Sequence, residues 1–228
     1  MTLSPEDREA ILSLPHNVRT LEPGSYLLRD GDLATTCSVI LSGFACRHKV
    51  VIDGARQILA IHMKGDGIDF QNALLGHADH NIQAITRLEV AAIPASAIND
   101  FLLAHPAAGR AILTEVLTDA SIQREWTANV GRRDARTRLC HLLCEIGLRQ
   151  EAAGIGARDR FELPLTQEQL ADATGLTAVH VNRVLQGLRA ERVIASEKRV
   201  VNVSSWDELT RIGDFRSAYL QQGGRNGA

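Results

Sequence analysis

Between Thr166 and Leu188 the chain reads TQEQLADATGLTAVHVNRVLQGL, a pattern typical of two short helices separated by a tight turn. A capping box opens the first helix, because Thr166 can act as the N-cap and Gln169 follows three residues later. That helix is predicted to end at Gly175, which supplies the turn, and Thr177 can cap a second helix. Two helices joined in this way are the signature of a helix-turn-helix, whose second helix enters the major groove of DNA.

The second of these helices has separate apolar and polar sides. Its polar side would lack a partner if the two helices served only as a core, so we favour nucleic-acid binding over a purely structural role. Four apolar positions are predicted to pack inward, namely Val181, Val184, Leu185 and Leu188.

Short elements flank the two helices. Val193–Ala195 and Val200–Val203 are predicted to be strands about a turn at Glu197–Lys198, which is typical of the wing in a winged helix-turn-helix. Phe161–Leu165 is predicted to be a preceding strand. A capping box also predicts a final helix near Trp206–Leu220, to which the sequence assigns no role.

A long helix is expected upstream, after residues 105 and 106. Its apolar residues recur close to a heptad seam over about 25 residues, a length of ~37 Å. An exposed helix with such a stripe needs a partner. We therefore favour a parallel dimer over the alternative that the helix packs back on its own domain. The predicted interface comprises Ile112, Leu113, Val116, Leu117, Ala120 and Thr127.

The amino-terminal part has a different sequence pattern. From Leu21 to Pro94, short β-type runs alternate with glycine turns at roughly ten-residue spacing, which favours an antiparallel roll or barrel. A helix over Ala97–Leu103 should close this part, and residues 131–134 should form a hinge before a helix over residues 135–150. The fold class is therefore α+β, with a β-roll sensor over 1–105, a dimerisation helix and hinge over 106–132, and a winged helix-turn-helix over 133–228.

Charge separates the two halves of this 228-residue chain, although its formal net charge is only -2. Residues 1–130 carry 10 basic and 15 acidic side chains, whereas residues 131–228 carry 15 basic and 12 acidic ones. A basic excess in one half is expected where one domain meets phosphates. The sequence has neither an export signal nor a long apolar stretch, so no membrane association and a cytoplasmic location are expected. The four cysteines are too scattered for a disulfide framework.

The glycines Gly24, Gly31, Gly43, Gly54 and Gly65 are regularly spaced, and the runs Leu165–Ala171, Gly175–Thr177 and Val181–Leu185 follow them. With these residues the chain resembles, from Leu21 to Val203, the Crp/Fnr family of bacterial transcription regulators. Residues 131–139 and 179–183 are similar to a subgroup common in alphaproteobacteria, for which no effector is fixed. The resemblance implies a non-enzymatic homodimer that binds a pseudo-palindromic operator and contacts RNA polymerase.

The resemblance also implies roles in DNA binding. Arg183 matches the base-reading arginine of the family, which contacts a guanine edge bidentately. His180 and Asn182 are candidates for base or phosphate contacts, and Thr177 for a phosphate contact at the helix start. Val179 stands where the family usually has glutamate, and it can touch a thymine methyl but cannot accept a hydrogen bond from cytosine. Thr166 and Lys198 complete the predicted set.

The predicted effector pocket departs from that of members that bind cyclic AMP. Their Gly-Glu pair aligns with Asp69-Phe70, and their phosphate-binding Arg-Ser or Arg-Thr pair aligns with Ala78-Asp79. Gln123-Arg124 replace the base-binding pair on the long helix. A carboxylate repels a phosphate, and no arginine at these positions supplies the bidentate bonds that a phosphodiester favours. We therefore expect an effector other than a cyclic nucleotide, with an atypical cyclic-nucleotide pocket as the alternative.

No cofactor or metal is predicted, although haem or another small-molecule effector stays open. The amino-terminal cysteine cluster of oxygen-sensing members is absent, and Cys140 and Cys144 are interpreted as core residues. His77-x-Asp79-His80 has metal-like spacing but falls in a predicted loop. Haem ligation would have to come from His48, His62, His77 or His80. Two other function classes remain: a cupin-like metal enzyme fused to a helix-turn-helix, and an interaction protein that heterodimerises with homologues.

Overall fold

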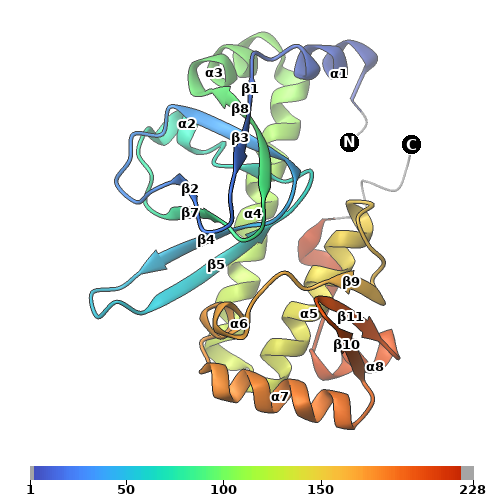
Figure 1. Ribbon diagram of the computed structural model, residues 1–228. Coiled ribbons are helices and arrows are strands. Elements are labelled where there is room, and N and C mark those ends of the chain that lie inside the picture. The colour runs from blue at the N-terminus through green and yellow to red at the C-terminus, as the bar shows by residue number, and fades with distance from the viewer. Residues whose placement is uncertain (1–2, 222–228) are drawn as a thin grey trace. The chain divides into compact units, whose positions relative to one another are not determined.

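The computed structural model describes residues 3–221, which form two compact units (Figure 1). The first comprises residues 3–49 and 61–121, and the second comprises residues 50–60 and 122–221. The segment 50–60 joins the second unit through an ion pair of 2.7 Å between Arg56 and Asp172. The domain limits predicted at 105 and 132 thus remain a prediction, and residues 1, 2 and 222–228 of the predicted domains lie outside the described residues.

Two four-stranded sheets form the predicted roll. Their strand orders are β1-β8-β3-β6 and β2-β7-β4-β5. Strand β3 pairs antiparallel with β8, as β4 does with β7, and Ile40, Ile82, Leu88 and Val90 form a buried cluster within the roll. The strands are β1 (Asn17–Leu21), β2 (Tyr26–Leu28), β3 (Thr36–Ser42), β4 (Ala45–Val50), β5 (Arg56–His62), β6 (Gly67–Ile68), β7 (Asn81–Ala84) and β8 (Leu88–Pro94).

Helices pack at one end of the roll, where Cys37, Ile98, Phe101 and Ala108 form a second buried cluster. The chain begins with α1 (Pro5–Leu12), and α2 (Asn72–Leu75), α3 (Ala95–Ala104) and the 27-residue α4 (Pro106–Arg132) follow. The long helix is thus confirmed. Gly131 does not break it, however, because a helix tolerates a single glycine at modest cost. The break falls at Arg133, and Asp134 caps the next helix by accepting a hydrogen bond from the Thr137 amide.

The second unit contains the winged helix-turn-helix. Its sheet has the order β10-β11-β9. Two predicted elements differ in extent: the strand near Phe161 ends before Pro164, which lacks an amide hydrogen, and the last helix stops before Gly213. The elements are α5 (Ala135–Ala152), β9 (Arg160–Glu162), α6 (Gln167–Thr174), α7 (Ala178–Ala190), β10 (Ile194–Glu197), β11 (Val200–Val203), α8 (Trp206–Ile212) and the 3-10 turn η1 (Ser217–Leu220).

None of the helices within residues 3–221 combines the length and the apolar character needed to cross a membrane.

Two features require glycine at position 43 of the roll: a left-handed backbone conformation and a close approach to the backbone of Arg87. Gly43 has a φ of +87°, and a Cβ built on it would lie 2.1 Å from the carbonyl oxygen of Arg87. Gly24 has a similar φ of +84°, but a Cβ there would have no atom within 4 Å. The two positions therefore separate backbone strain from steric overlap.

We expect Gly24→Ala to lower the free energy of unfolding by about 1 to 2 kcal/mol, since only the left-handed backbone is penalised. Gly43→Ala should cost ~1–3 kcal/mol more, because β3 and β8 must separate locally to admit the methyl group. Denaturant unfolding of both variants measures the difference. Equal losses at the two positions would contradict the close approach at Gly43.

Candidate DNA-binding surface and effector site

The turn between α6 and α7 is built from local contacts. Thr166 Oγ1 accepts from the Gln169 amide at 3.1 Å, and Gln169 Oε1 accepts from the Thr166 amide at 2.9 Å, which confirms the capping box. Gly175 ends α6 with a φ of +64°. Thr177 Oγ1 then accepts from the His180 amide at 3.2 Å and starts α7. These caps set the direction of both helices within a few residues.

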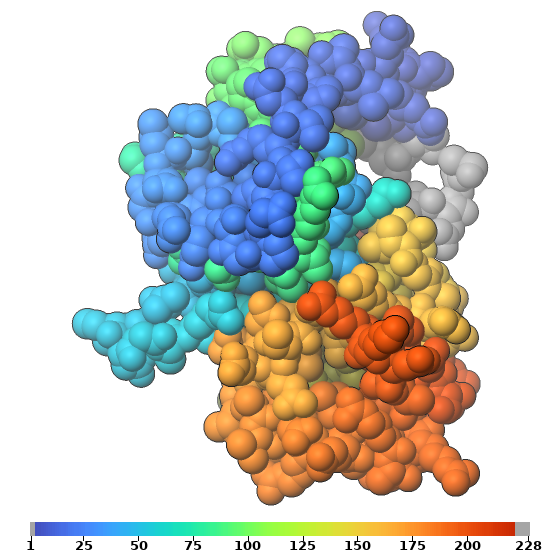
Figure 2. Space-filling model, viewed as in Figure 1, coloured from blue at the N-terminus to red at the C-terminus, as the bar shows by residue number. Residues whose placement is uncertain are grey.

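Helix α7 buries one face and opens the other. Val181, Leu185 and Leu188 are buried as predicted, whereas Val184 is only half-buried. Val179 is 78% exposed, and Arg183 is exposed one turn further along. In the space-filling view, the orange surface of α7 lies open along the lower edge of the second unit (Figure 2). The major groove of B-DNA admits an α-helix, so an exposed helix face of this kind can enter it.

The other predicted DNA-binding residues differ in their surroundings. Thr177 is exposed, and its side-chain oxygen caps α7. His180 is half-buried. Asn182 is also half-buried, and its Oδ1 accepts from Gln167 Nε2 at 3.3 Å, so this side chain links α7 to α6. Val179, in the first turn of α7, and Arg183, one turn later, are therefore the members of the set that are exposed within the helix.

A hollow of about 240 Å³ lies between the two helices and the wing. It brings the predicted residues Thr166 and Lys198 to the same site, together with Arg189 and Arg199, which the sequence analysis did not single out. Lys198 is exposed at the wing turn, where its φ is +54°. Clustered basic residues at the end of α7 and on the wing are the expected footprint of phosphate binding, and this clustering could have identified both arginines.

In the first unit, the predicted effector residues Asp69 and Asp79 belong to a polar network. Arg47 Nη1 donates to Asp119 Oδ2 at 2.6 Å, and its Nη2 lies 3.4 Å from Asp69 Oδ1. His80 lies between two carboxylates, with Nε2 2.9 Å from Asp69 Oδ1 and Nδ1 2.7 Å from Asp79 Oδ1. Arg47, Asp69 and His80 are buried. Arg47 belongs to β4 and not to the aligned motif positions, which carry no arginine.

This network controls the charge of its members. Burial alone would raise the pKa of Asp69, but the hydrogen bond from His80 and the charge of Arg47 hold that pKa below its ordinary value. Burial alone would lower the pKa of His80, but its bond to Asp69 outweighs burial and raises the pKa. Because both ring nitrogens of His80 face carboxylates, the ring offers no open nitrogen to a haem iron.

The remaining predicted effector residues have separate surroundings. Phe70 packs over Gly67, where a built Cβ would lie 2.2 Å from the ring. Gln123 belongs to the second unit and donates from Nε2 to the Leu59 carbonyl oxygen at 2.8 Å. Arg124 is exposed. Only Asp69 and Asp79 are thus joined, through His80.

The cysteines are buried, and the metal-like motif of residues 77–80 does not bring a set of metal ligands together. Cys37, Cys46, Cys140 and Cys144 are buried and form no disulfide, and burial raises the pKa of Cys37 to about 11 and that of Cys140 to about 12. His77 is exposed. Within the part of the chain that the structure describes, no three histidine, cysteine or acidic side chains converge as metal ligands.

Comparison with known families supports the two-part architecture. A model of the cyclic nucleotide-binding domain matches residues 18–105, and a model of the Crp-like helix-turn-helix domain matches residues 137–212. The two matches do not overlap and occur in the order expected from the sequence.

The relatives include characterised regulators. The transcriptional activator protein FnrL of Cereibacter sphaeroides is 27% identical over 195 residues, which cover 84% of this chain and 78% of FnrL. The nitrogen fixation regulation protein FixK of Rhizobium meliloti is 26% identical over 203 residues, covering 88% and 89% of the two chains. The structure of FixK2 from Bradyrhizobium japonicum shares the fold, with a TM-score of 0.79 at 19% identity, covering 87% of this chain and 98% of FixK2.

Both family models, the open face of α7 and these relatives agree. The chain belongs to the Crp/Fnr family and is a DNA-binding transcription regulator.

Proposed function

We propose that the protein acts in the cytoplasm as a non-enzymatic homodimer that reads a pseudo-palindromic operator with α7 of each protomer. The observation that carries this proposal is the open face of α7, on which Val179 and Arg183 are exposed while Val181 and Leu185 anchor the helix. Paired recognition helices require half-site centres about 34 Å apart. The bound dimer then contacts RNA polymerase, as the family resemblance implies.

Two exposed leucines on α4 support the dimer. Leu113 is 54% exposed and Leu117 is 59% exposed, and residues four apart lie on one face of a helix. Burying them against a second α4 removes apolar surface from water. Val116 and Ala120 are half-buried beside them. Ile112 packs against the core of its own unit instead, so we assign it a smaller share of the interface.

The effector in this proposal is not a cyclic nucleotide. By the family resemblance, Asp69 aligns with the ribose-binding pair and Asp79 with the phosphate-binding pair, and the pKa of each carboxyl group is held below its ordinary value. They therefore stay ionised at neutral pH and repel a phosphate. The guanidinium of Arg47 already donates to Asp119 and Asp69, so a phosphodiester would have to displace two carboxylates to bind it.

We expect Arg183→Ala to weaken binding to the cognate operator by about 1 to 3 kcal/mol and to remove discrimination at one base pair of each half-site. Arg189→Ala is the matched control, since Arg189 lies at the hollow beside the wing. Arg189→Ala should weaken binding to all DNA sequences by the same factor and reduce the salt dependence of binding. Binding to a panel of single-base operator variants at two salt concentrations distinguishes these results. Unchanged base preference in Arg183→Ala would remove it from the specificity residues.

Replacing both Leu113 and Leu117 with aspartate should disperse the dimer and abolish operator binding, because like charges would face each other across the seam. The control replaces Leu74 and Leu75 with aspartate, since these leucines are 76% and 70% exposed on α2. Sedimentation and operator binding are measured on both proteins. An unchanged dimer in the α4 variant would refute the assigned interface.

Cyclic AMP and cyclic GMP at millimolar concentration should leave the melting temperature unchanged. A ligand present at a hundred times its Kd would raise the stability of the native state by about 2.7 kcal/mol, which a melting curve detects readily. The operator duplex serves as the positive control. A saturable rise with either nucleotide would support the atypical cyclic-nucleotide pocket instead.

A further inference from the structure

Five charged or titratable side chains of the first unit, which we call the charged row, link a surface loop to the long helix. His80 contacts Asp79 through Nδ1 at 2.7 Å and Asp69 through Nε2 at 2.9 Å. Arg47 of β4 lies 3.4 Å from Asp69 and donates to Asp119 of α4 at 2.6 Å. The side chain of Asp79 is 84% exposed, whereas His80 and Asp69 are buried. The charged row therefore begins in solvent and ends on α4.

The contacts of His80 require a proton on both ring nitrogens. An ionised carboxylate only accepts hydrogen bonds, and each ring nitrogen of His80 faces one carboxylate. The neutral ring has a single N–H, so its second nitrogen would turn a lone pair toward a carboxylate oxygen. Only the imidazolium form makes both bonds. This arrangement is therefore that of a histidine that has bound a proton.

Charged groups on several elements act on this proton. Burial of the ring opposes protonation, but the hydrogen bond to Asp69 and the charge of Asp69 outweigh burial and the charge of Arg47. The pKa of His80 is therefore raised above its ordinary value. The other charged or titratable groups that act on Asp69 or Asp79 come from the strands, namely Cys37 on β3, Lys49 on β4 and His62 on β5.

The direction of this shift fixes the pH range in which the proton matters. A histidine in the unfolded chain has a pKa of about 6.5. Because folded His80 binds its proton more tightly, its contacts contribute their full stabilisation below about pH 6.5. That stabilisation is lost as the pH rises through the raised pKa of His80 in the folded protein.

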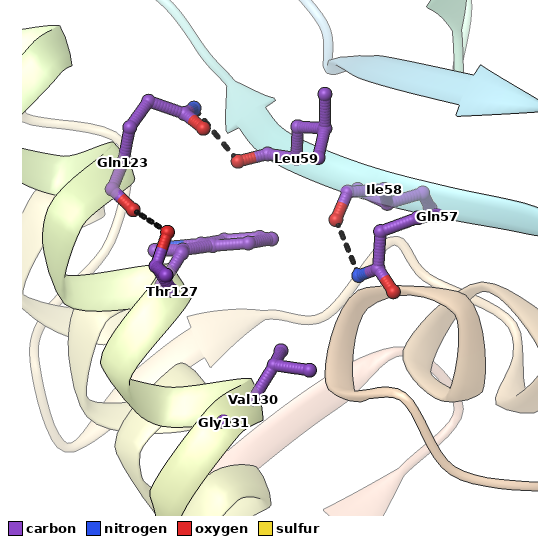
Figure 3. Close-up of a pocket in the computed structure, with 8 residues that line it drawn as sticks. Gln57, Ile58, Leu59, Gln123, Thr127, Val130 and Gly131 are labelled. Atoms are coloured by element: carbon purple, nitrogen blue, oxygen red, sulfur yellow. Dashed lines mark hydrogen bonds between the residues drawn. The ribbon is translucent and has the colours of Figure 1, made fainter.

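The predicted effector residue Gln123 on α4 contributes no titratable group. It lines a cavity of about 350 Å³ within the second unit and donates from Nε2 to the Leu59 carbonyl oxygen (Figure 3). None of the eight residues that line this cavity is charged or titratable. A change of pH alters no charge in its lining, so a response to protons belongs to the charged row.

Loss of the proton changes the charge balance around Arg47. With His80 protonated, two cations face the carboxylates of Asp69 and Asp119. With His80 neutral, one guanidinium has to serve both carboxylates. Asp69 is buried and cannot turn to water, whereas the side chain of Asp119 is 30% exposed and can. Arg47 is therefore drawn toward Asp69, and the contact between β4 and α4 weakens.

Asp119 lies in the part of α4 that we assign to the dimer. Val116 precedes it by three positions, and Ala120 follows it directly. Residues three apart are neighbours on a helix surface. A change at Asp119 thus acts beside the proposed contact between two copies of α4.

We propose that the proton is an effector of this regulator: its binding to His80 keeps Arg47 on Asp119 and thereby holds α4 in the conformation that dimerises. This inference rests on the proposed function, because it names a signal for the DNA-binding dimer. Proton binding and dimer formation are linked, so the dimer weakens as its protons are released.

The first measurement is the titration of His80 in the full-length protein, followed by nuclear magnetic resonance with isotope-labelled histidine. His80→Gln identifies the signal of His80 by removing it. We expect a midpoint above the ordinary value of about 6.5, and a lower midpoint in Asp79→Asn, which lacks one of the two negative charges. A midpoint at or below the ordinary value in the unaltered protein would overturn the proton site.

The second measurement is the dimer dissociation constant between pH 6 and 9 at fixed ionic strength. It is made without DNA, so that histidines of the DNA-binding unit such as His180 meet no phosphate. We expect the dimer to weaken about tenfold or more over this range. His80→Gln should abolish the pH dependence, and Asp119→Asn should abolish it while His80 still titrates. His77→Gln is the matched control and should behave as the unaltered protein, because His77 is exposed and lies outside the charged row.

Each failure has a separate meaning. Equal pH dependence of dimerisation in the unaltered protein and in His80→Gln would overturn the role of His80. Undiminished pH dependence in Asp119→Asn would overturn the route through Arg47. A monomer at every pH would refute the proposed dimer, and failure to select any DNA at pH 6 would refute the proposed function. The midpoint of His80 decides independently of both whether the proton site exists.

Discussion

A single continuous helix constrains the molecule more than any other element. Helix α4 contributes residues up to 121 to the first unit and the remainder to the second, without an interruption in its hydrogen bonds. Ile112 and Ala108 pack into one core, and Trp126 and Ile122 are buried in the other unit. Because a helix fixes the angular spacing of its residues, one register sets the exposed leucines, the contacts of Ile112 in the first unit and the burial of Trp126 in the second. A change in that register would disturb all three at once.

The helix-turn-helix could be predicted because its determinants act over short distances along the chain. Thr166 with Gln169, Gly175, and Thr177 with His180 each act within four residues, and each has the predicted geometry. The alternating strands and glycine turns of the roll were accessible for the same reason. The ends of two elements were not predicted: the strand before Pro164 ends three residues earlier than expected, and the last helix ends eight residues earlier, before Gly213. Competing local contacts decide where such elements end.

The contents of the sites could not be predicted in the same way. Arg47 meets Asp69 across 22 residues and Asp119 across 72, and no local pattern announces such pairs. The aligned motif positions showed what had been lost from a nucleotide pocket, but not the arginine that enters from β4. Likewise, Gln57 and Gln123 line one cavity only because residues 50–60 join the second unit. Glu145 accepts a hydrogen bond from the Tyr219 hydroxyl, which lies 74 residues further along the chain.

The burial of the cysteines has a consequence for how the protein responds to its surroundings. Thiolate is the reactive form of cysteine, and burial of Cys37 and Cys140 raises their pKa values and leaves very little thiolate in the folded state. The native protein should therefore resist alkylation and oxidation at these two positions although neither cysteine is in a disulfide. Cys37 lies in the first unit and Cys140 in the second, so modification of each site counts the openings of its own unit. The rates at which Cys37 and Cys140 are modified therefore report separately on local unfolding of the first and the second unit.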